Sequence, residues 1–329
     1  MKSVVTFLKN TRLAKKQVHK NLTMFPLLSP DLIEPYYLTL EQAIEAGCIE
    51  ITEVDESGSV NDLALKVTGR KPVLLVEGEE LKGAKQNRLI NASFLIAGGT
   101  RTKLPVSCVE EGRWRYASRQ FSSGNKMMHA SVRREAQQAV KSNLERGGGH
   151  RSDQGRIWNN IAETTRRMKV ASPTMAMADV FDSYEDKLAD YTGRFHLMEQ
   201  QAGALFAIDG KIAGLECFGS HDTFGRFFKK LVQSYALDAL DRSERKEKIP
   251  SVPPAKARAF VASAVKSKGR RHKAVSLGET ISFESRIVSG AALADINKVL
   301  HLSAFRKNRG SGGSRVGFRR FSSRRRSRY

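Results

Sequence analysis

Short apolar runs, closely spaced and separated by turn-forming residues, occupy the chain from about residue 38 to residue 116. Such runs predict strands, and the lack of a helix-length pattern between them favours an antiparallel sandwich or barrel. A short helix is expected just before them, over residues 39–46, with Thr39 as its cap and Gly47 at its end. The predicted strands are residues 49–54, 63–67, 73–76, 89–96 and 104–109.

The pattern of apolar positions becomes helical over residues 128–195. It predicts a first helix over residues 131–145, which the three glycines at 147–149 end. Further helices are expected to begin at Ser152-Asp153 and at Ser172-Pro173. At the latter position a capping serine precedes a proline that would stand at the first helical position.

A mixed pattern follows. Residues 205–217 predict a hairpin, because Asp209-Gly210 supplies the positive φ angles of a tight turn. An amphipathic helix is predicted over residues 223–240, and His221-Asp222 precedes it, with Asp222 interpreted as its cap. The later predictions are a linker over residues 246–254, a helix over 255–266, strands over 274–277 and 280–287, and a closing strand over 291–305.

Together these elements predict an α+β fold. A β-rich, sandwich- or barrel-like half (residues 22–127) is expected to pack with a helical and β-hairpin half (residues 128–305) as one unit. Residues 1–21 form a basic N-terminal extension. Residues 306–329 are Gly, Ser, Arg and little else, which predicts a disordered basic tail.

The formal net charge of +22 is concentrated at the two ends of the chain. Residues 1–20 carry +6 and residues 306–329 carry +10, both without any acidic residue, which leaves +6 for the 285 residues between them. The body of the protein is therefore only mildly basic. The tail, in which Phe318, Phe321 and Tyr329 are interleaved with arginines, suits nonspecific contacts with nucleic acid.

Several protein classes are disfavoured. The apolar runs are too short to cross a bilayer, so no membrane association is expected, and no secretory signal is read at the N-terminus. Three cysteines without a CxxC pair fit a reducing cytoplasm. Phosphate-loop, dinucleotide-fold, kinase, hydrolase and zinc-protease motifs are all missing, and the seven histidines lack ligand spacing. No cofactor is indicated, and the metal requirement stays unknown.

The densest run of functional side chains is residues 77–88, between two apolar strand runs. Its carboxylates can act as general bases or metal ligands, and its amides and cations can bind a ligand. The plainer interpretation is a charged hairpin that faces solvent. The candidate residues in this run are Glu77, Glu79, Glu80, Lys85, Gln86, Asn87 and Arg88.

A second polar run, residues 107–116, contains Glu110, Arg113 and Trp114. Arginine beside an aromatic ring suits a ligand with a phosphate and a base, because guanidinium pairs with phosphate and the ring stacks. Alternatively, Trp114 anchors the core. Cys108 is best interpreted as a small buried hydrophobe. Glu216, at the end of the predicted hairpin, either joins the first run in space or is simply half-buried.

These segments resemble an uncharacterised bacterial family, the ARG (ADP-ribosylglycohydrolase) and rhodanese-phosphatase-superfamily-associated protein domain. The resemblance runs from about residue 22 to residue 305, and the tail lies outside it. Its long, unusual motifs are residues 73–88 and 105–114. Shorter matches are Ser152-Asp153-Gln154, Ser172-Pro173-Thr174, Gly214-Leu215-Glu216, residues 230–240, His301-Leu302 and Phe305.

The resemblance implies a role near ADP-ribose or another NAD-derived nucleotide, but no reaction. We therefore expect binding or processing of a nucleotide-like small molecule. Glu77, Glu79, Glu80 and Glu110 would be the catalytic candidates. Lys85, Gln86, Asn87, Arg88, Arg113 and Trp114 would bind the ligand. The alternatives are a nucleic-acid-binding protein that uses residues 306–329 and a non-catalytic partner protein.

Overall fold

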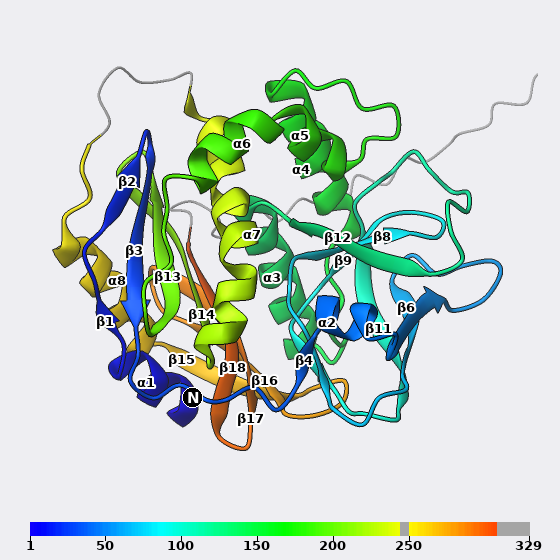
Figure 1. Cartoon of the computed structure of the whole chain (residues 1–329), viewed down its shortest axis with the longest axis horizontal. Coiled ribbons are helices and arrows are strands. Elements are labelled where there is room, and N and C mark those ends of the chain that lie inside the picture. Colours follow the sequence, from blue (N-terminus) through cyan, green and yellow to red (C-terminus); the bar gives the residue numbers. More distant parts are fainter. Residues whose placement is uncertain (244–249, 308–329) are drawn as a thin grey trace, which may run out of the picture.

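The computed structural model describes residues 1–243 and 250–307, which form two β-rich halves joined by helices (Figure 1). One half is a half-barrel built from residues 38–127, and the other is a nine-stranded sheet with helices on both faces. The fold is α+β, as the sequence predicts. Residues 246–249 of the predicted linker (246–254) lie outside the described residues, and so does the tail after Lys307.

The half-barrel consists of a six-stranded and a three-stranded sheet. All its strand pairs are antiparallel except β4 with β7, so the predicted antiparallel character is confirmed. The six-stranded sheet, in spatial order, is β12 (Phe121–Met127), β8 (Glu79–Gly83), β9 (Arg88–Ile90), β11 (Arg101–Cys108), β6 (Asp62–Val67) and β5 (Ile49–Glu53). The three-stranded sheet is β10 (Phe94–Ile96), β7 (Val73–Leu75) and β4 (Leu38–Thr39).

The nine-stranded sheet combines the start of the chain with its last third. β3 pairs with β13 across almost its whole length, which places residues 22–28 beside the hairpin β13–β14. The spatial order is β1 (Arg12–Leu13), β3 (Leu22–Leu28), β13 (Gln201–Ile208), β14 (Lys211–Phe218), β18 (Lys298–Arg306), β17 (Val288–Asp295), β16 (Glu279–Glu284) and β15 (Lys268–Lys273), and β2 (Gln17–His19) pairs with β3.

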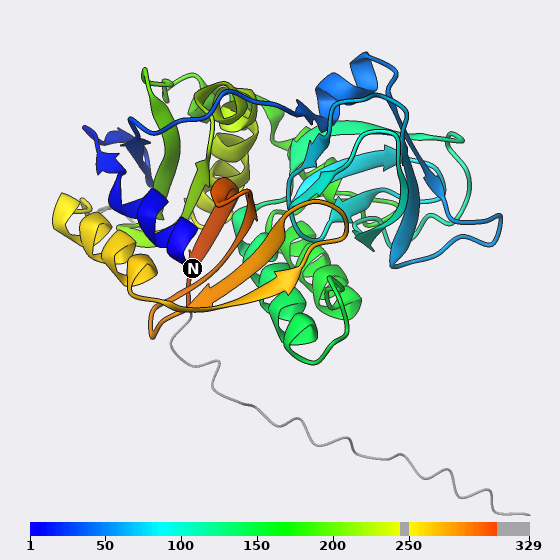
Figure 2. The same ribbon diagram turned by 90° about the horizontal axis from the view of Figure 1, so that it is seen from below.

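Helices cover both faces of this sheet. α1 (Lys2–Lys9) and α8 (Pro254–Val265) lie side by side on one face, where Val4 and Phe260 join a common core (Figure 2). α7 (His221–Leu240) covers the other face, and its apolar residues share a core with Leu74 and Val76 of the half-barrel. The two halves therefore share buried apolar contacts.

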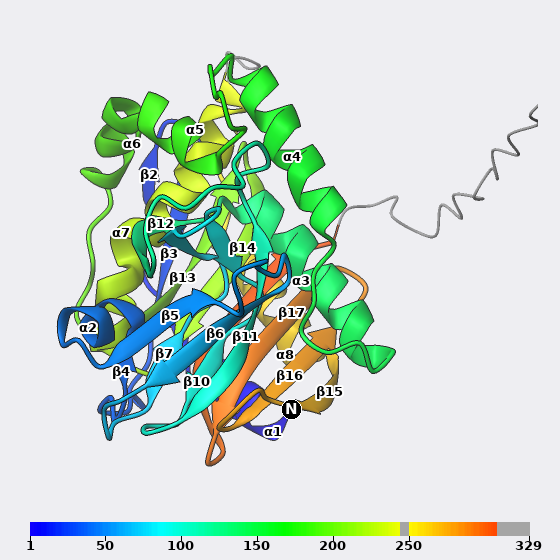
Figure 3. The same ribbon diagram turned by 90° about the vertical axis from the view of Figure 1, so that its right-hand side faces the viewer.

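The remaining helices lie between and around the two halves. α3 (Ala130–Glu145) contacts β17 of the large sheet, and α4 (Gln154–Arg167) beside it contacts β11 of the half-barrel (Figure 3). α5 (Met177–Ser183) and α6 (Glu185–Thr192) follow. α2 (Leu40–Glu45) begins with a capping box of Thr39 and Gln42, which confirms the predicted cap.

Two predicted helix starts are wrong. The third helix does not begin at Ser172-Pro173 but at Met177, because the Ser172 hydroxyl accepts the Ala176 amide (2.8 Å) and closes a turn first. The cap of α7 is Ser220, whose hydroxyl accepts the Thr223 amide (3.4 Å), and Asp222 stands in the first turn instead.

Three predicted strands also differ from the strands of the structure. The predicted strand over residues 89–96 is divided into β9 and β10, which belong to different sheets. The strand expected over residues 274–277 is instead β15, earlier in the chain. The closing strand expected over residues 291–305 is a hairpin, β17–β18, whose turn residues Ile296 and Asn297 adopt positive φ angles of 45° and 64°.

Candidate functional site

The polar run over residues 77–88 follows the path β7, tight turn, β8, turn, β9. The first turn contains Glu77 and Gly78, and Gly78 has a φ of 89°. A Cβ atom at this glycine would collide with the Arg133 side chain, so the turn can lie directly on α3 only as glycine. The candidate side chains of the run are buried, which differs from a charged hairpin facing solvent.

Arg88 is completely buried at the centre of a first group of polar residues. Its guanidinium donates to Gln86 Oε1 (3.0 Å) and to Glu53 Oε1 (3.4 Å), and it also contacts the Cys108 thiol. Burial raises the pKa of Cys108 to about 11, although the nearby Arg88 charge opposes this, so the thiol stays protonated at neutral pH. The charge of Arg88 is thus balanced inside the protein by Glu53.

Arg113 and Glu110 form a second ion pair next to this group, with Arg113 Nη2 2.7 Å from Glu110 Oε2. Arg113 also donates to Asn87 Oδ1 (3.1 Å), and Glu110 accepts from the Asn87 amide (3.2 Å) and from the Thr174 hydroxyl (2.9 Å). Burial raises the pKa of Glu110, but these hydrogen bonds and the Arg113 charge outweigh burial and hold it below its usual value. Glu110 is therefore ionised, and its carboxylate is bound by Arg113, Asn87 and Thr174.

Trp114 and Tyr116 lie on the surface above Lys85, and their exposed fractions are 46% and 52%. The Lys85 ammonium is 5.3 Å from the Trp114 ring and 5.2 Å from the Tyr116 ring. The same ammonium donates to the Ser57 carbonyl (3.0 Å) and contacts the Glu56 carbonyl. The two rings thus cover a lysine that is already bound by backbone groups.

Glu79 and Glu80 point to opposite sides of β8. Glu79 accepts from the Val76 amide (2.7 Å), and its other oxygen is 3.9 Å from the Lys230 ammonium. Glu80 accepts from Asn87 Nδ2 (3.2 Å) and lines a small, mainly apolar cavity with Lys126 at its side. Burial raises the pKa of each carboxyl group to about 7. Both can exchange a proton near neutral pH.

Glu77 belongs to a third group, which we call the inner network: Glu77, Arg133, Gln137, Glu216, Tyr235, His301 and Ser303. Arg133 Nη2 and the Tyr235 hydroxyl both donate to Glu216 Oε1, each at 2.8 Å. Gln137 donates to Glu77 Oε1 (3.2 Å), and Ser303 also contacts that oxygen. Glu216 therefore joins the same network as Glu77 and is completely buried.

The structure thus divides the predicted residues among the Arg88 group, the Arg113–Glu110 group, the inner network and the surface aromatic pair above Lys85, whereas Glu79 lies apart beside Lys230. Arg133 and Gln137 have no signal in the sequence beyond helical position, and Tyr235 stands only in the family match over residues 230–240, so sequence reasoning misses all three as functional groups. His301 stands only in a short match to the family. Within the described residues, no group of three or more His, Cys, Asp or Glu side chains is arranged to hold a metal ion.

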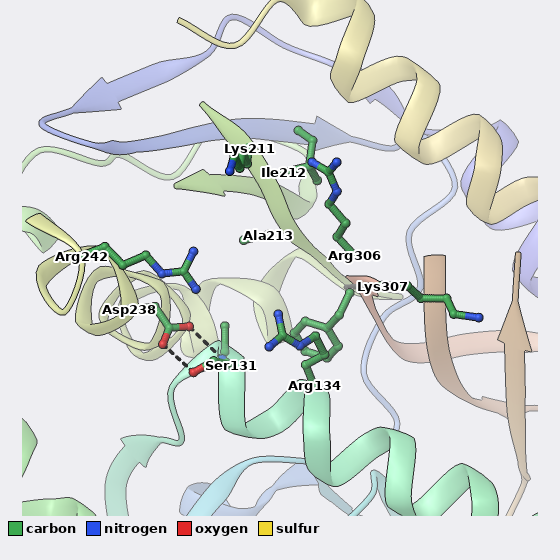
Figure 4. Close-up of a pocket in the computed structure, with 11 residues that line it drawn as sticks. Ser131, Arg134, Lys211, Ile212, Ala213, Asp238, Arg242, Arg306 and Lys307 are labelled. Carbon is green, nitrogen blue, oxygen red and sulfur yellow. Dashed lines mark hydrogen bonds between the residues drawn. The ribbon is translucent and has the colours of Figure 1, made fainter. Parts of the chain in front are cut away.

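A different region of the described chain contains a cavity with a volume of about 500 Å³ (Figure 4). We call it the basic pocket. It lies where the N-terminus of α3, the C-terminal end of α7, the start of β14 and the end of β18 meet. Among the residues that the structure describes, its cationic side chains are Arg134, Lys211, Arg242, Arg306 and Lys307, and its one carboxylate is Asp238.

The Asp238 carboxylate stabilises the start of α3. Its two oxygens accept the Ser131 amide (2.8 Å) and the Ser131 hydroxyl (2.7 Å), so it satisfies the first turn of α3 (Figure 4). Lys307 is turned outward and pairs with Glu284 at 3.2 Å. In residues 1–243 and 250–307, no carboxylate lies within ion-pair distance of the other four cationic side chains of the pocket.

The basic pocket and the inner network share α3, α7, β14 and β18, and Glu77 reaches the network from the turn between β7 and β8. On α3, Ser131 and Arg134 line the pocket, whereas Arg133 belongs to the network. On β18, Phe305 lines the pocket, and its ring lies 5.4 Å from the Arg133 guanidinium carbon. The network is therefore the layer directly beneath the pocket, and it fixes the positions of the elements that carry the cations.

These features define an α+β protein with a strongly cationic pocket above a buried polar network. The chain matches the sequence model of the ARG and Rhodanese-Phosphatase-superfamily-associated Protein domain over residues 10–305. It belongs to this family, as its motifs indicate. No curated protein and no solved structure matches it significantly. Over the described residues, no helix has both the length and the apolar character needed to cross a bilayer.

Proposed function

We propose that the protein binds a nucleotide-like, phosphate-bearing small molecule, such as ADP-ribose or another NAD-derived nucleotide, with the phosphates in the basic pocket. One observation carries the proposal. Arg134, Lys211, Arg242 and Arg306 line a single pocket, and no carboxylate of the described residues pairs with them.

Electrostatics supports an anionic ligand. Cations held close together repel one another, and this repulsion opposes folding unless a counter-charge occupies the space between them. In Figure 4 the guanidinium groups of Arg134 and Arg242 both point toward the centre of the pocket. Guanidinium groups match the geometry of phosphate oxygens with two parallel hydrogen bonds, so two arginines suit a diphosphate better than a single carboxylate.

The size and remaining lining of the pocket suit the rest of a nucleotide. A volume of about 500 Å³ falls within the range of small-molecule and cofactor sites. Ile212, Ala213 and Phe305 provide apolar surface between the cations. The family's name refers to ADP-ribosylglycohydrolases, which makes ADP-ribose the first ligand to try.

Under this proposal the candidate residues of the two polar runs, 77–88 and 107–116, support the fold around the pocket and do not contact the ligand. Arg88, Arg113 and Lys85 already bind Glu53, Glu110 and backbone carbonyls, so phosphate would have to displace those partners. Such displacement leaves a buried carboxylate without its partner, which costs about 3–5 kcal/mol. The proposal is therefore one of ligand binding, and it assigns no reaction to Glu77, Glu79, Glu80 or Glu110.

Isothermal titration of the full chain with ADP-ribose, ADP, NAD and pyrophosphate tests the proposal. A ligand at 100 times its Kd also stabilises the protein by roughly 2.7 kcal/mol, which a thermal-shift assay detects. We expect Arg134→Gln and Arg242→Gln each to weaken binding at least tenfold. Arg101→Gln, which removes an exposed cation from β11, is the matched control and should leave the Kd unchanged.

Two results would contradict the proposal. If Arg134→Gln and Arg242→Gln bind as tightly as the original chain while Trp114→Ala does not, the ligand binds over the exposed aromatic pair instead. If none of the four compounds binds, the pocket does not recognise nucleotide phosphates. Incubation with ADP-ribose, followed by chromatography of the products, also detects any turnover.

We also propose a cytoplasmic location. Cys48, Cys108 and Cys217 all have free thiols, as is usual in a reducing compartment. Treatment of intact cells and of lysates with a membrane-impermeant thiol reagent, followed by cell fractionation, tests this. Recovery of the protein in an extracellular fraction would contradict it.

A further inference from the structure

The edge strand β15 is unusually basic. It reads Lys268-Gly269-Arg270-Arg271-His272-Lys273, and all of these residues except His272 are exposed. Residues 251–278, which include α8 and β15, contain seven Lys or Arg residues and no acidic residue. Charged side chains on an edge strand also discourage pairing with other chains. The position of these charges relative to the basic pocket points to a further role.

Strand pairing places half of the β15 side chains on the pocket face of the sheet. Gly269 pairs with Phe283, which packs in the core beneath α1 and α8, so Gly269 faces that side. Side chains alternate along a strand, and therefore Lys268 and Arg270 point to the opposite face. Glu284, the partner of Lys268 across the pair, contacts Lys141 of α3 at 2.7 Å, which confirms the direction.

The same row of residues leads to the pocket. Phe305, which lines the pocket, pairs with Ser289 on β17, Ser289 pairs with Glu284 on β16, and Glu284 pairs with Lys268 on β15. Glu284 also holds Lys307 of the pocket at 3.2 Å. Three strand spacings of ~4.8 Å separate Phe305 at the pocket from Lys268, which is roughly 15 Å.

We propose that the basic pocket continues across the sheet to β15, and that the two together bind the phosphate backbone of a nucleic acid. This inference rests on the proposed function of the pocket and extends its ligand from one nucleotide to a chain of them. We define the basic track as Lys268 and Arg270 together with the pocket cations. One strand of a duplex carries a phosphate about every 3.4 Å, so ~15 Å corresponds to about four phosphates.

The chemistry of the track favours a phosphate backbone over bases or a peptide. In the described part of the chain the only aromatic side chain that lines the pocket is Phe305, which is buried, so base stacking contributes little. Within the described residues, Arg270 forms no ion pair and no side-chain hydrogen bond. It is free to contact an external anion. An acidic peptide that extends the sheet at β15 would reach the edge but not the pocket, about 15 Å away.

Fluorescence anisotropy with a labelled 12-nucleotide single strand and the matching duplex tests the inference on the full chain. The test variant is Lys268→Gln with Arg270→Gln. The matched control is Arg101→Gln with Lys103→Gln, which removes two exposed cations from β11 in the half-barrel. Titrations at several salt concentrations give the slope of log K against log salt, which reports how many phosphates are neutralised.

We expect the β15 double variant to bind both oligonucleotides more weakly and to lower the magnitude of the slope by about 1.4 for the single strand and 1.8 for the duplex. ADP-ribose binding in the pocket should not change. The control should behave like the original chain. These three results together support the inference.

Three other outcomes would overturn it. In the first, the β15 variant and the control have the same affinity and the same slope. In the second, the oligonucleotides bind no more tightly than ADP-ribose. In the third, a poly-glutamate peptide competes for binding as well as DNA does. In each case ADP-ribose binding that depends on Arg134 would still uphold the proposed function. Loss of that dependence would instead show that the proposed function itself has failed.

Discussion

The Arg133 guanidinium on α3 lies 2.8 Å from the Glu216 carboxylate on β14, and both side chains are almost completely shielded from solvent. Burial alone would raise the pKa of Glu216, but the Arg133 charge and the hydrogen bonds to Glu216 hold it below its usual value. The pair therefore stays charged inside the protein. It ties α3 to the large sheet directly beneath the basic pocket.

Removal of Arg133 alone should destabilise the protein strongly. Arg133→Met leaves Glu216 as an uncompensated buried charge, so we expect a loss of about 3–5 kcal/mol in the free energy of unfolding. The double variant Arg133→Met with Glu216→Leu should recover part of this loss, because neither charge remains. Urea unfolding measures both.

The exposed pair Asp222–Arg226 on α7, with 3.1 Å between its atoms, is the control. Arg226→Met should cost less than about 1 kcal/mol, because solvent screens the pair. Equal costs for the two arginine variants would show that Glu216 is not held as a buried ion.

The turn that carries Glu77 should depend on Gly78 for two separate reasons. Its φ of 89° disfavours any side chain, and a Cβ atom would also collide with Arg133. Gly99 has a similar φ of 68°, but a Cβ atom there meets nothing within 4 Å. Gly99→Ala therefore measures the backbone cost alone, about 1–2 kcal/mol.

We expect Gly78→Ala to cost about 1–3 kcal/mol more than Gly99→Ala, because Arg133 must move. Chemical denaturation of the two variants gives the comparison. If the two variants lose the same stability, the turn at Gly78 does not pack against Arg133 of α3 as closely as described.

Local signals are the part of the fold that the sequence predicts well. The capping box of Thr39 and the Asp209-Gly210 turn act over a few residues, and both are found as expected. The start of α5 is missed because the Ser172 hydroxyl closes a turn that looks like a helix cap in the sequence. The pairing of β3 with β13 joins residues far apart in the chain, which no local pattern indicates.

For the site, residue types are visible in the sequence but burial is not. Arg88 reads as a ligand-binding arginine on a loop, yet its partner Glu53 comes from another strand and encloses it. The basic pocket escapes notice for the opposite reason. Arg134, Lys211 and Arg242 come singly from α3, β14 and the residues after α7, and Arg306 and Lys307 read in the sequence as the start of the basic tail.

Stability should depend on pH through Glu79 and Glu80. Burial raises the pKa of each carboxyl group from 4.5 to about 7 in the folded protein. Between these values the folded state holds protons that the unfolded state has released. The contribution of each group is thus fully present below about pH 4.5 and is lost as pH rises through 7, by at most ~1.4 kcal/mol per pH unit.

Glu79→Gln removes one of these titrating groups. The free energy of unfolding of this variant should therefore fall less between pH 5 and pH 7.5 than that of the original chain. Urea unfolding at four pH values in this range measures the difference. Glu111→Gln, at an exposed position, is the control and should follow the original chain. A Glu79→Gln curve parallel to the original would mean that Glu79 does not take up a proton on folding.

Asp238 should have opposite effects on stability and on ligand binding. Its carboxylate accepts two hydrogen bonds from Ser131 at the start of α3, so Asp238→Asn should cost about 1 kcal/mol of stability. The same change removes the only carboxylate that lines the basic pocket among residues 1–243 and 250–307. Affinity for ADP-ribose should then rise about fivefold, which corresponds to ~1 kcal/mol.

Asp222→Asn makes the same charge change at the far end of α7, roughly 25 Å away, and should leave the Kd unchanged. Calorimetric titration and urea unfolding of the two variants separate these effects, and weaker ADP-ribose binding by Asp238→Asn would mean that the carboxylate organises the pocket rather than opposing the anion.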